Sequence, residues 1–373
     1  MKLIIGGDFC PQYRLKEKFE NKDFESVLLN IKPIISHADY SIVNFECPVV
    51  YGKENTIDKI GSNLCCSENG IEAIKWAGFD CVTLANNHFL DYGEQGVVNT
   101  LNACHRYGID TVGGGKNISA ASQTLFKDFG EQRLAIINCC EHEFSIASEK
   151  TAGANPLNPI QQYYAIKEAR NNATHVLVII HGGNEYYQLP SPRMKEQYRF
   201  FIDAGADAVI NHHQHCYSGY EYYKGKPIVY GLGNLCFDEV NNLGKIWNEG
   251  YMAMVEFLET EITLKLIPYI QCEKDPTICL MDREQKDMFN SQIEKLNHII
   301  ADDSLLAENY DSFIKKSHKS IDMLFNPYKG RVLSGLYRRH LLPSLVDKKK
   351  KLTLFNYIQC ESHLPKIVNY LKF

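Results

Sequence analysis

The chain has 373 residues and a formal net charge of −5 at pH 7. This length can bury a large core, and it predicts either two domains or one large α/β domain. The weakly acidic balance excludes an overall attraction to nucleic acid or to anionic lipid. The thirteen cysteines are scattered and form no Cys-x-x-Cys motif, so we interpret them as reduced, buried thiols of a cytosolic protein.

The N-terminal apolar run covers only residues 3–5, which is too short for a signal peptide or a spanning helix. No later segment reaches about 18 uninterrupted apolar residues. From these two observations we expect a soluble, cytoplasmic protein.

Short apolar runs of strand type alternate with helical patterns over most of the chain. The runs lie at residues 2–5, 40–45, 80–85, 175–180, 207–210 and 227–232. The helical patterns lie at residues 69–79, 94–108 and 194–205, and the last two of them close on a glycine. Strands that alternate with helices predict parallel or mixed sheets covered by helices.

From about residue 250 the pattern changes. Residues 251–259 and 262–270 predict an antiparallel hairpin. Helical patterns follow at residues 291–300, 305–325 and 352–371. We therefore expect a domain boundary near residue 272, with an α/β domain at 1–272 and a helical extension at 273–373.

Several predicted strands end in a polar residue that can bind a metal ion. These residues are Asp8, Glu46, Asn87, His181, His213 and His215. In sheets of this kind, ligands bind beyond the carboxyl ends of the strands, so we expect all six side chains on one rim. Each of them alone is a weak indication, because Asp8 can cap a turn, Asn87 can lie in a turn, and the histidines can be polar residues at strand ends. Together they supply the carboxylate, amide and imidazole ligands that divalent cations take, which favours a metal site.

Three histidines stand at positions 212, 213 and 215 of this rim. On an extended segment, His213 and His215 point to one face and His212 points to the other. We therefore expect two ligands and one histidine that is turned away. His88, which follows Asn87, is expected to face the substrate. In a site with two metal ions about 3.5–4 Å apart, a bridging water attacks a phosphoester, and His88 would protonate the leaving oxygen.

The rim residues lie in motifs of a known family. The motifs are GGDFCP, HADYSIVNFECPV, LANNHFLDYG, VIIHGGNEYY, FIDAGADAVINHHQH and GKPIVYGLGNLCFD, in this order within about residues 3–240. They resemble the capsule-synthesis CapA family of poly-γ-glutamate synthesis proteins, a branch of the calcineurin-like metallophosphoesterase superfamily. The resemblance implies a four-layer αββα sandwich, in which helices flank two central sheets.

The resemblance also implies roles for single residues. Asp8 corresponds to the first metal-binding aspartate, and Glu46 stands where the superfamily usually has a bridging aspartate. Asn87 corresponds to the asparagine ligand and His88 to the catalytic histidine. The remaining histidine ligands are matched by His181, His213 and His215. The implied cofactors are one or two divalent metal ions (Mn, Zn or Fe). The implied substrate pocket comprises Cys10, Glu185, Tyr186, Glu221 and Asn234.

Two functions are compatible with these motifs. The first is a metal-dependent hydrolase that acts on a phosphoester or related bond during capsule or exopolymer production. The second is a binding module that grips a polyanionic polymer and recruits membrane-associated biosynthetic proteins. Cys10, in place of a superfamily histidine, and Gln214, in place of a family proline, favour the binding module. The intact pair of Asn87 and His88 favours the enzyme.

The segment at residues 328–352 is basic within an acidic protein. It has two interpretations. It can contact anionic lipid headgroups or a polyanionic product, or it can be a solvated helical face.

Overall fold

The computed structural model describes residues 1–360 and 362–371. The chain forms two compact units, Met1–Ala307 and Glu308–Phe373.

The first unit extends beyond the boundary that the sequence predicts near residue 272. Strand β16 (Ile278–Leu280) pairs with the hairpin strand β15 (Ile262–Gln271). Helix α9 (Arg283–Ala301) packs one apolar face on the core of the first unit. That face consists of Phe289, Ile293, Leu296 and Ile300. The segment after the hairpin is therefore helical as predicted, but its first helix completes the α/β unit.

An eight-stranded mixed sheet forms one central layer of the first unit. Its strands run in the order β16-β15-β14-β1-β2-β3-β4, and β13 pairs with the end of β1. The bounds of the new strands are β1 (Lys2–Phe9), β2 (Tyr40–Phe45), β3 (Cys81–Thr83), β4 (Asp110–Val112), β13 (Asn234–Cys236) and β14 (Glu249–Phe257). Strands β1 to β4 are parallel, whereas β14 and β15 form the predicted antiparallel hairpin.

A six-stranded sheet forms the other central layer, in the order β11-β12-β10-β9-β7-β6. The bounds are β6 (Leu125–Phe129), β7 (Gln132–Cys140), β9 (His175–His181), β10 (Ala208–His212), β11 (Tyr220–Tyr223) and β12 (Lys226–Val229). A short pair, β5 (Gly114–Gly115) and β8 (Gly153–Ala154), lies apart from both sheets in the pairing order. Six consecutive residues of β9 are buried, as expected for a parallel strand that is covered on both faces.

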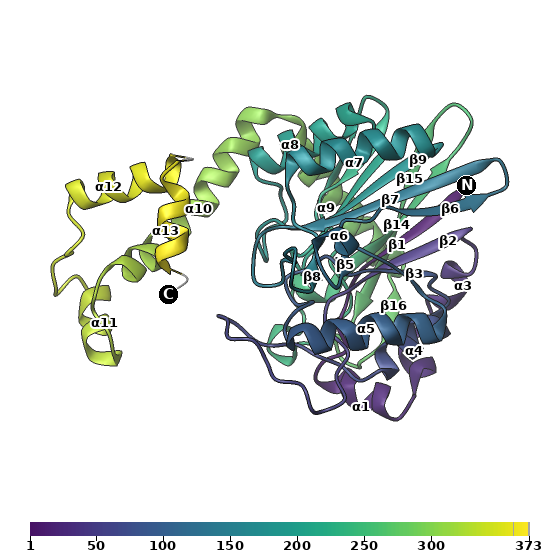
Figure 1. The fold of residues 1–373 in the computed structure, drawn as a ribbon, viewed down its shortest axis with the longest axis horizontal. Coiled ribbons are helices and arrows are strands. Elements are labelled where there is room, and N and C mark those ends of the chain that lie inside the picture. The colour runs from purple at the N-terminus through teal and green to yellow at the C-terminus, as the bar shows by residue number, and fades with distance from the viewer. Residues whose placement is uncertain (361, 372–373) are drawn as a thin grey trace. The chain divides into compact units, whose positions relative to one another are not determined.

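Helices cover the outer face of each sheet. On the first sheet these are α1 (Arg14–Glu20), α2 (Phe24–Leu28), α3 (Lys32–Ile35), α4 (Asn69–Ala77) and α5 (Gly93–Tyr107). On the second sheet these are α7 (Pro159–Asn172) and α8 (Pro192–Ala204). Figure 1 shows α4 and α5 on one side of the strands and α7 and α8 on the other. Apolar residues of both sheets share one buried cluster, which confirms the four-layer αββα arrangement.

Short helical turns complete the first unit. They are α6 (Ile118–Ala121), η1 (Val240–Asn242) and η2 (Ile246–Asn248). The longer helices α4 and α5 end at glycines in the left-handed conformation, Gly78 with φ 100° and Gly108 with φ 62°. Glycine adopts this conformation without strain.

The second unit is helical, as the sequence predicts. Helix α10 (Asp303–Phe325) begins in the first unit, and α11 (Arg331–Arg338), α12 (Lys348–Gln359) and α13 (Leu364–Leu371) follow. Within the described residues, no helix has both the length and the apolar character that crossing a bilayer requires.

Candidate metal centre

The candidate ligands stand where strands of the two sheets end. Asp8 is the penultimate residue of β1, and Glu46 directly follows β2. His181 is the last residue of β9, and His212 is the last residue of β10. The rim that the sequence predicts is therefore built from the strand ends of two sheets rather than one, and the following contacts bring these ends together.

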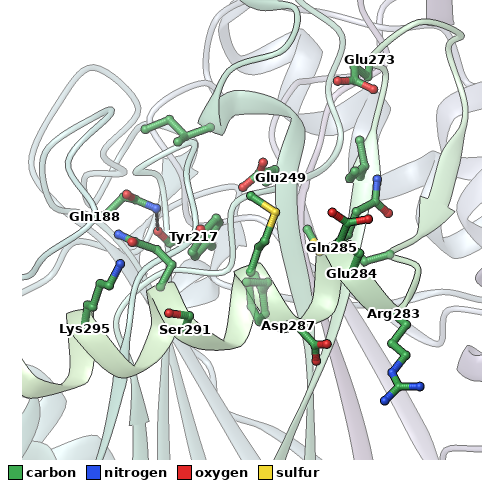
Figure 2. Close-up of a pocket in the computed structure, with 16 residues that line it drawn as sticks. Gln188, Tyr217, Glu249, Glu273, Arg283, Glu284, Gln285, Asp287, Ser291 and Lys295 are labelled. Atoms are coloured by element: carbon green, nitrogen blue, oxygen red, sulfur yellow. Dashed lines mark hydrogen bonds between the residues drawn. The ribbon is translucent and has the colours of Figure 1, made fainter.

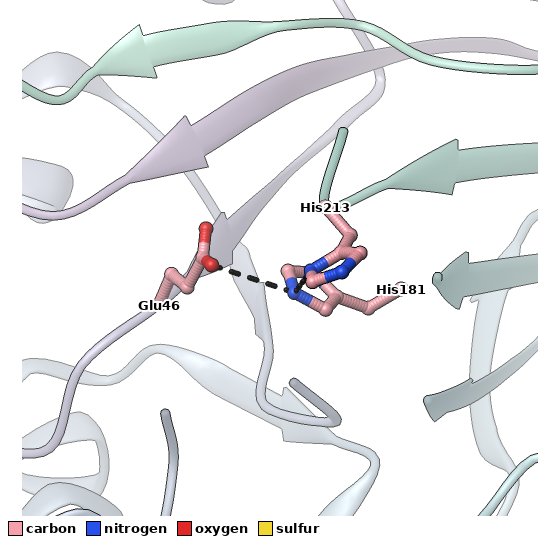
Figure 3. Close-up of side chains that lie close together, drawn as sticks. All are labelled: Glu46, His181 and His213. Carbon is pink, nitrogen blue, oxygen red and sulfur yellow. Dashed lines mark hydrogen bonds and ion pairs between the residues drawn. The ribbon is translucent and has the colours of Figure 1, made fainter. Parts of the chain in front are cut away.

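Glu46 lies between two groups of potential ligands. Its carboxylate, His181 and His213 form one group, and its carboxylate, Asp8 and His215 form the other. Within each group the ligand atoms all lie within 4.8 Å of one another. Oε1 of Glu46 is 3.4 Å from Nε2 of His181 and 3.7 Å from Nε2 of His215, and Figure 3 shows the first of these contacts. Glu46 thus occupies the position of a carboxylate shared by two sites.

Asn87 joins this cluster from the loop after β3. Its Oδ1 atom is 3.0 Å from Nε2 of His181. Its backbone carbonyl accepts a hydrogen bond from the Ser145 hydroxyl at 2.7 Å. The structure therefore places all six residues that the sequence predicts as ligands in one buried cluster.

Asn44 is a residue of the site that the sequence reasoning missed. Its Nδ2 atom is 2.7 Å from Oδ1 of Asp8 and 3.3 Å from Nδ1 of His181. Its own Oδ1 accepts a hydrogen bond from the Thr83 hydroxyl. Such partners orient ligand side chains. The sequence feature that could have identified Asn44 is its position in β2, two residues before Glu46, because residues two apart along a strand point to the same face.

The charges of the cluster are not balanced by protein groups. Glu46 is fully buried, and in the described part of the chain neither of its carboxylate oxygens has a hydrogen-bond partner. Burial, together with the nearby Asp8 carboxylate, raises the pKa of Glu46 well above its ordinary value. A buried carboxylate without a partner is strongly unfavourable, so the free energy of this arrangement improves if a cation binds.

The imidazoles of His181 and His213 are held in the neutral state, which binds metals. Burial and the neighbouring His213 lower the pKa of His181 well below its ordinary value. Burial and His215 lower the pKa of His213 to about 3. Burial would raise the pKa of Asp8, but His212 and the other imidazoles hold it below its ordinary value. Neutral imidazoles and an ionised carboxylate are the forms that coordinate divalent cations, so the residues present fit such a metal.

His212 does not turn away from the cluster, so that prediction was wrong. Its Nδ1 atom is 3.2 Å from Oδ1 of Asp8, and the side chain is 1% exposed. Strand β10 ends at His212, and His213 and His215 follow with φ of 90° and 53°. Because this backbone is left-handed rather than extended, the alternation of faces that the prediction assumed does not apply.

Cys10 does not line a pocket, in contrast to the prediction. Its side chain is fully buried in the core between the first sheet and its helices. Gln12 contacts its sulfur atom at 3.3 Å. The pairing register of β1 shifts between Asp8 and Phe9 and again between Gly6 and Asp8. The resemblance implied a pocket position for Cys10 because it stands in place of a superfamily histidine, but the strand beside Asp8 is irregular in this chain.

Glu221 was also predicted in the pocket, but it bonds elsewhere. It lies on β11, and its carboxylate accepts hydrogen bonds from Arg199 at 2.5 Å and from the Tyr230 hydroxyl at 2.6 Å. Since Arg199 belongs to α8, Glu221 ties that helix to the sheet. Neither of these two partners is a candidate ligand.

The other three predicted pocket residues are Asn234, which contacts the cluster, and Glu185 and Tyr186, which are exposed. Asn234 contacts Nδ1 of His215 at 2.9 Å through its Oδ1 atom and so orients that ring. Tyr186 is 49% exposed, and its ring stacks on that of Trp247 with the ring centroids 5.8 Å apart. The ring centroids of Trp247 and His215 are in turn 4.8 Å apart. Aromatic rings therefore connect the buried ligand His215 with the exposed Tyr186.

His88 belongs to a buried ionic triad beside the cluster. Its Nδ1 atom is 2.7 Å from Oδ2 of Asp91 and 3.1 Å from Nζ of Lys59. Lys59 and Asp91 are themselves paired at 2.5 Å, and their side chains are 2% and 0% exposed. The His88 side chain remains 13% exposed. Asp91 fixes the orientation of the ring through Nδ1, and no described residue forms a hydrogen bond with Nε2, which can therefore take part in chemistry.

Lys59 and Asp91 were not identified from the sequence. Asp91 carried a weak signal, because it follows His88 by three residues within the LANNHFLDYG motif. No sequence feature pointed to Lys59, because it lies in the segment between Val50 and Cys66, which has no helix or strand of its own. Long segments of this kind often serve binding sites.

A separate open pocket lies along helix α9. It has a volume of about 1030 Å³, and Figure 2 shows its side chains. The lining contains more acidic side chains than basic ones, and the basic ones are Arg283 and Lys295. The acidic residues are Glu249, Glu273, Glu284 and Asp287. None of the candidate metal ligands lines this pocket, so it is distinct from the buried cluster.

Comparison with known proteins places the chain in a family. The model of the bacterial capsule synthesis protein PGA_cap matches residues 2–239. The capsule biosynthesis protein CapA of Bacillus anthracis is 32% identical over 64% of this chain and 60% of its own length. The PGA biosynthesis protein CapA of Bacillus subtilis (strain 168) is 32% identical over 62% of each chain. This chain thus spans about three fifths of the length of these relatives.

A solved structure described as a novel phosphatase from Mycoplasma pneumoniae is also similar. It covers 74% of this chain and 95% of its own, with 15% sequence identity and a TM-score of 0.47. The family rests on the sequence match, which covers the strands and loops that carry every candidate ligand. The chain belongs to the bacterial capsule synthesis protein family.

Proposed function

We propose that this protein is a metal-dependent hydrolase that acts on a phosphoester or a related bond during capsule or poly-γ-glutamate production. The observation that carries the proposal is the buried carboxylate of Glu46. Its two oxygens lack hydrogen-bond partners among the described residues, and it stands between two groups of donor atoms. An array of this kind suits one or two divalent cations such as Mn, Zn or Fe.

The ligands of the proposed metal come from both sheets. Glu46 would be shared, with Asp8 and His215 on one side of it and His181 and His213 on the other. Asn87 would add an amide oxygen beside His181. When bound, the metal supplies an activated water as the nucleophile and offsets the charge that develops on the substrate.

His88 is the proposed acid. Its Nδ1 atom faces the Asp91 carboxylate, so Nε2 is the ring nitrogen that can hold a proton for the leaving oxygen. Lys59 is a positioning residue, because its ammonium group contacts both His88 and Asp91. The exposed residues Glu185 and Tyr186 are proposed to contact the substrate, for which we favour an anionic polymer or a phosphoester.

The alternative function is a binding module that grips an anionic polymer without cleaving it. It would use the same cluster to hold a metal. The contact between His88 and Asp91 favours the enzyme, because a binder has no need for an oriented proton donor.

Metal content and hydrolysis together test the proposal. Protein loaded with Mn²⁺ or Zn²⁺ and then desalted should retain metal by elemental analysis and should cleave an aryl phosphomonoester or phosphodiester. His88→Ala should retain the metal and lose at least about 100-fold in rate. The matched control is His105→Ala, which changes an exposed histidine on α5, and it should leave both properties unchanged.

Two outcomes contradict the hydrolase. Absence of retained metal after loading would remove the basis of both functions. Retained metal without cleavage of phosphoesters or γ-glutamyl amides would favour the binding module instead.

A further inference from the structure

The second unit carries the opposite charge to the first. Residues 308–373 contain thirteen Lys and Arg against five Asp and Glu, whereas residues 1–307 contain 27 against 40. Four consecutive lysines, Lys348–Lys351, open helix α12. The C-terminal segment is therefore strongly basic, although the formal net charge of the whole chain is negative.

The helices of this unit bury almost none of their apolar side chains. Among the apolar residues that the structure describes after Ala307, only Val346 is buried. Large side chains are exposed on each helix, including Leu324 at 82%, Val332 at 73%, Phe355 at 61% and Tyr370 at 80%. Short helices gain most of their stability from packing an apolar face. Exposed apolar surface on this scale marks an interaction site.

Basic and apolar side chains alternate along the same helices. In α11, Val332 and Leu333 follow Arg331, and both apolar side chains are exposed. In α12, Leu352 and Phe355 follow the four lysines and stand three residues apart, so they lie on one side of the helix. Beside them, Ile321 and Phe325 of α10 and Ile358 of α12 line an open groove of about 300 Å³.

We propose that residues 308–373 bind the surface of an anionic lipid bilayer. The exposed apolar side chains would enter the boundary between headgroups and acyl chains, and the Lys and Arg side chains would contact the lipid phosphates. Helices that combine these two kinds of side chain lie in the plane of a membrane surface, and each basic residue near an anionic surface adds to the attraction.

Two other occupants fit the observations less well. A soluble polyanion would pair with the charges of the lysines, but it would not bury apolar side chains such as Leu324 and Phe355. A second copy of the same unit covers the apolar surface but brings a net charge of the same sign, which opposes association. An anionic bilayer satisfies both requirements.

Co-sedimentation of the full chain with lipid vesicles tests this proposal. We expect binding to vesicles that contain phosphatidylglycerol, weak binding to vesicles of phosphatidylcholine alone, and a loss of binding in high salt. Replacing all four residues Lys348–Lys351 by Gln should lower the affinity by about tenfold or more. The double variant Leu352→Gln/Phe355→Gln should lower it by a similar factor at unchanged charge.

A matched control separates local from overall charge. It replaces four exposed lysines of the first unit by Gln, namely Lys16, Lys53, Lys116 and Lys150. This variant has the same net charge as the variant at Lys348–Lys351, and it should bind vesicles like the parent protein. Far-ultraviolet circular dichroism of each variant shows whether the helices persist.

Three outcomes would overturn the proposal. The first is equal binding to neutral and anionic vesicles. The second is a control variant that loses as much affinity as the variant at Lys348–Lys351. The third is a chain that does not bind vesicles but associates with soluble poly-γ-glutamate, or with itself, through the same lysines and apolar side chains. None of these results depends on the hydrolase, because binding is measured without a substrate.

Discussion

Oε1 of Glu46 lies 3.4 Å from Nε2 of His181, in a contact that joins the end of a strand in one sheet to the end of a strand in the other. Burial shifts the two pKa values in opposite directions, upward for the carboxyl group and downward for the imidazole. Without a metal, both groups therefore favour their neutral forms. A divalent cation would replace the carboxyl proton and use the imidazole lone pair.

The first prediction concerns the shared carboxylate. Glu46→Gln keeps the size of the side chain but removes the charge, so metal affinity measured by isothermal titration calorimetry should fall by more than about 100-fold. The raised pKa of Glu46 means that a charged carboxylate opposes folding above its unfolded pKa. The metal-free variant should therefore be at least as stable as the parent at pH 7 in urea unfolding.

The exposed Glu25 on α2 supplies the control for this substitution. Glu25→Gln should change neither metal affinity nor stability. Tight metal binding by Glu46→Gln would show that the carboxylate is not a ligand.

The second prediction is a loss of stability in acid. The pKa of His213 is lowered from 6.5 to about 3 in the folded protein. Between these values the unfolded chain binds a proton that the folded chain does not, so the free energy of unfolding falls as the pH falls. For this one group, the loss between pH 7 and pH 5 is about 2 kcal/mol.

His213→Gln should reduce this pH dependence in metal-free protein, measured by urea unfolding at both pH values. His105→Gln changes an exposed histidine and should leave the dependence as it is in the parent. Identical slopes for His213→Gln and the parent would mean that His213 takes up its proton at the same pH in the folded and unfolded states, so that burial does not lower its pKa.

Regular patterns made most of the fold predictable. Strands such as β9 appear in the sequence as continuous apolar runs, because both faces are covered. The polar residues at their ends, including Glu46 and His181, could be predicted as residues at the carboxyl ends of parallel strands. The sequence did not show that these two strands belong to different sheets. The boundary near residue 272 was wrong because a helical pattern does not tell which core the helix packs on. In this chain α9 packs on the first unit.

Local backbone geometry explains the site residues that were misplaced. His212 was predicted on the wrong face because the left-handed residues His213 and His215 interrupt the strand. Cys10 was predicted in the pocket from the resemblance, and the register shifts of β1 beside it leave no trace in the sequence. Lys59 was missed because its role depends entirely on a tertiary contact with Asp91.

The third prediction concerns this buried pair. Lys59→Met leaves the Asp91 carboxylate buried without its cation, and it should lower the free energy of unfolding by about 3 kcal/mol. Adding Asp91→Asn removes the unpaired charge. The double variant should therefore lose at least about 1 kcal/mol less than the sum of the two single losses, in a double-mutant cycle by urea unfolding.

The same variants separate a positioning role of Lys59 from substrate binding. If the ammonium group holds Asp91 and so orients His88, Lys59→Met should lower kcat about tenfold with little change in KM. Lys59→Arg should recover part of the loss, because a guanidinium group can still pair with the carboxylate. A rise in KM at constant kcat would instead identify Lys59 as a substrate-binding residue. Unchanged kinetics alongside the expected loss of stability would restrict the role of the pair to holding the segment between Val50 and Cys66 against the rest of the first unit.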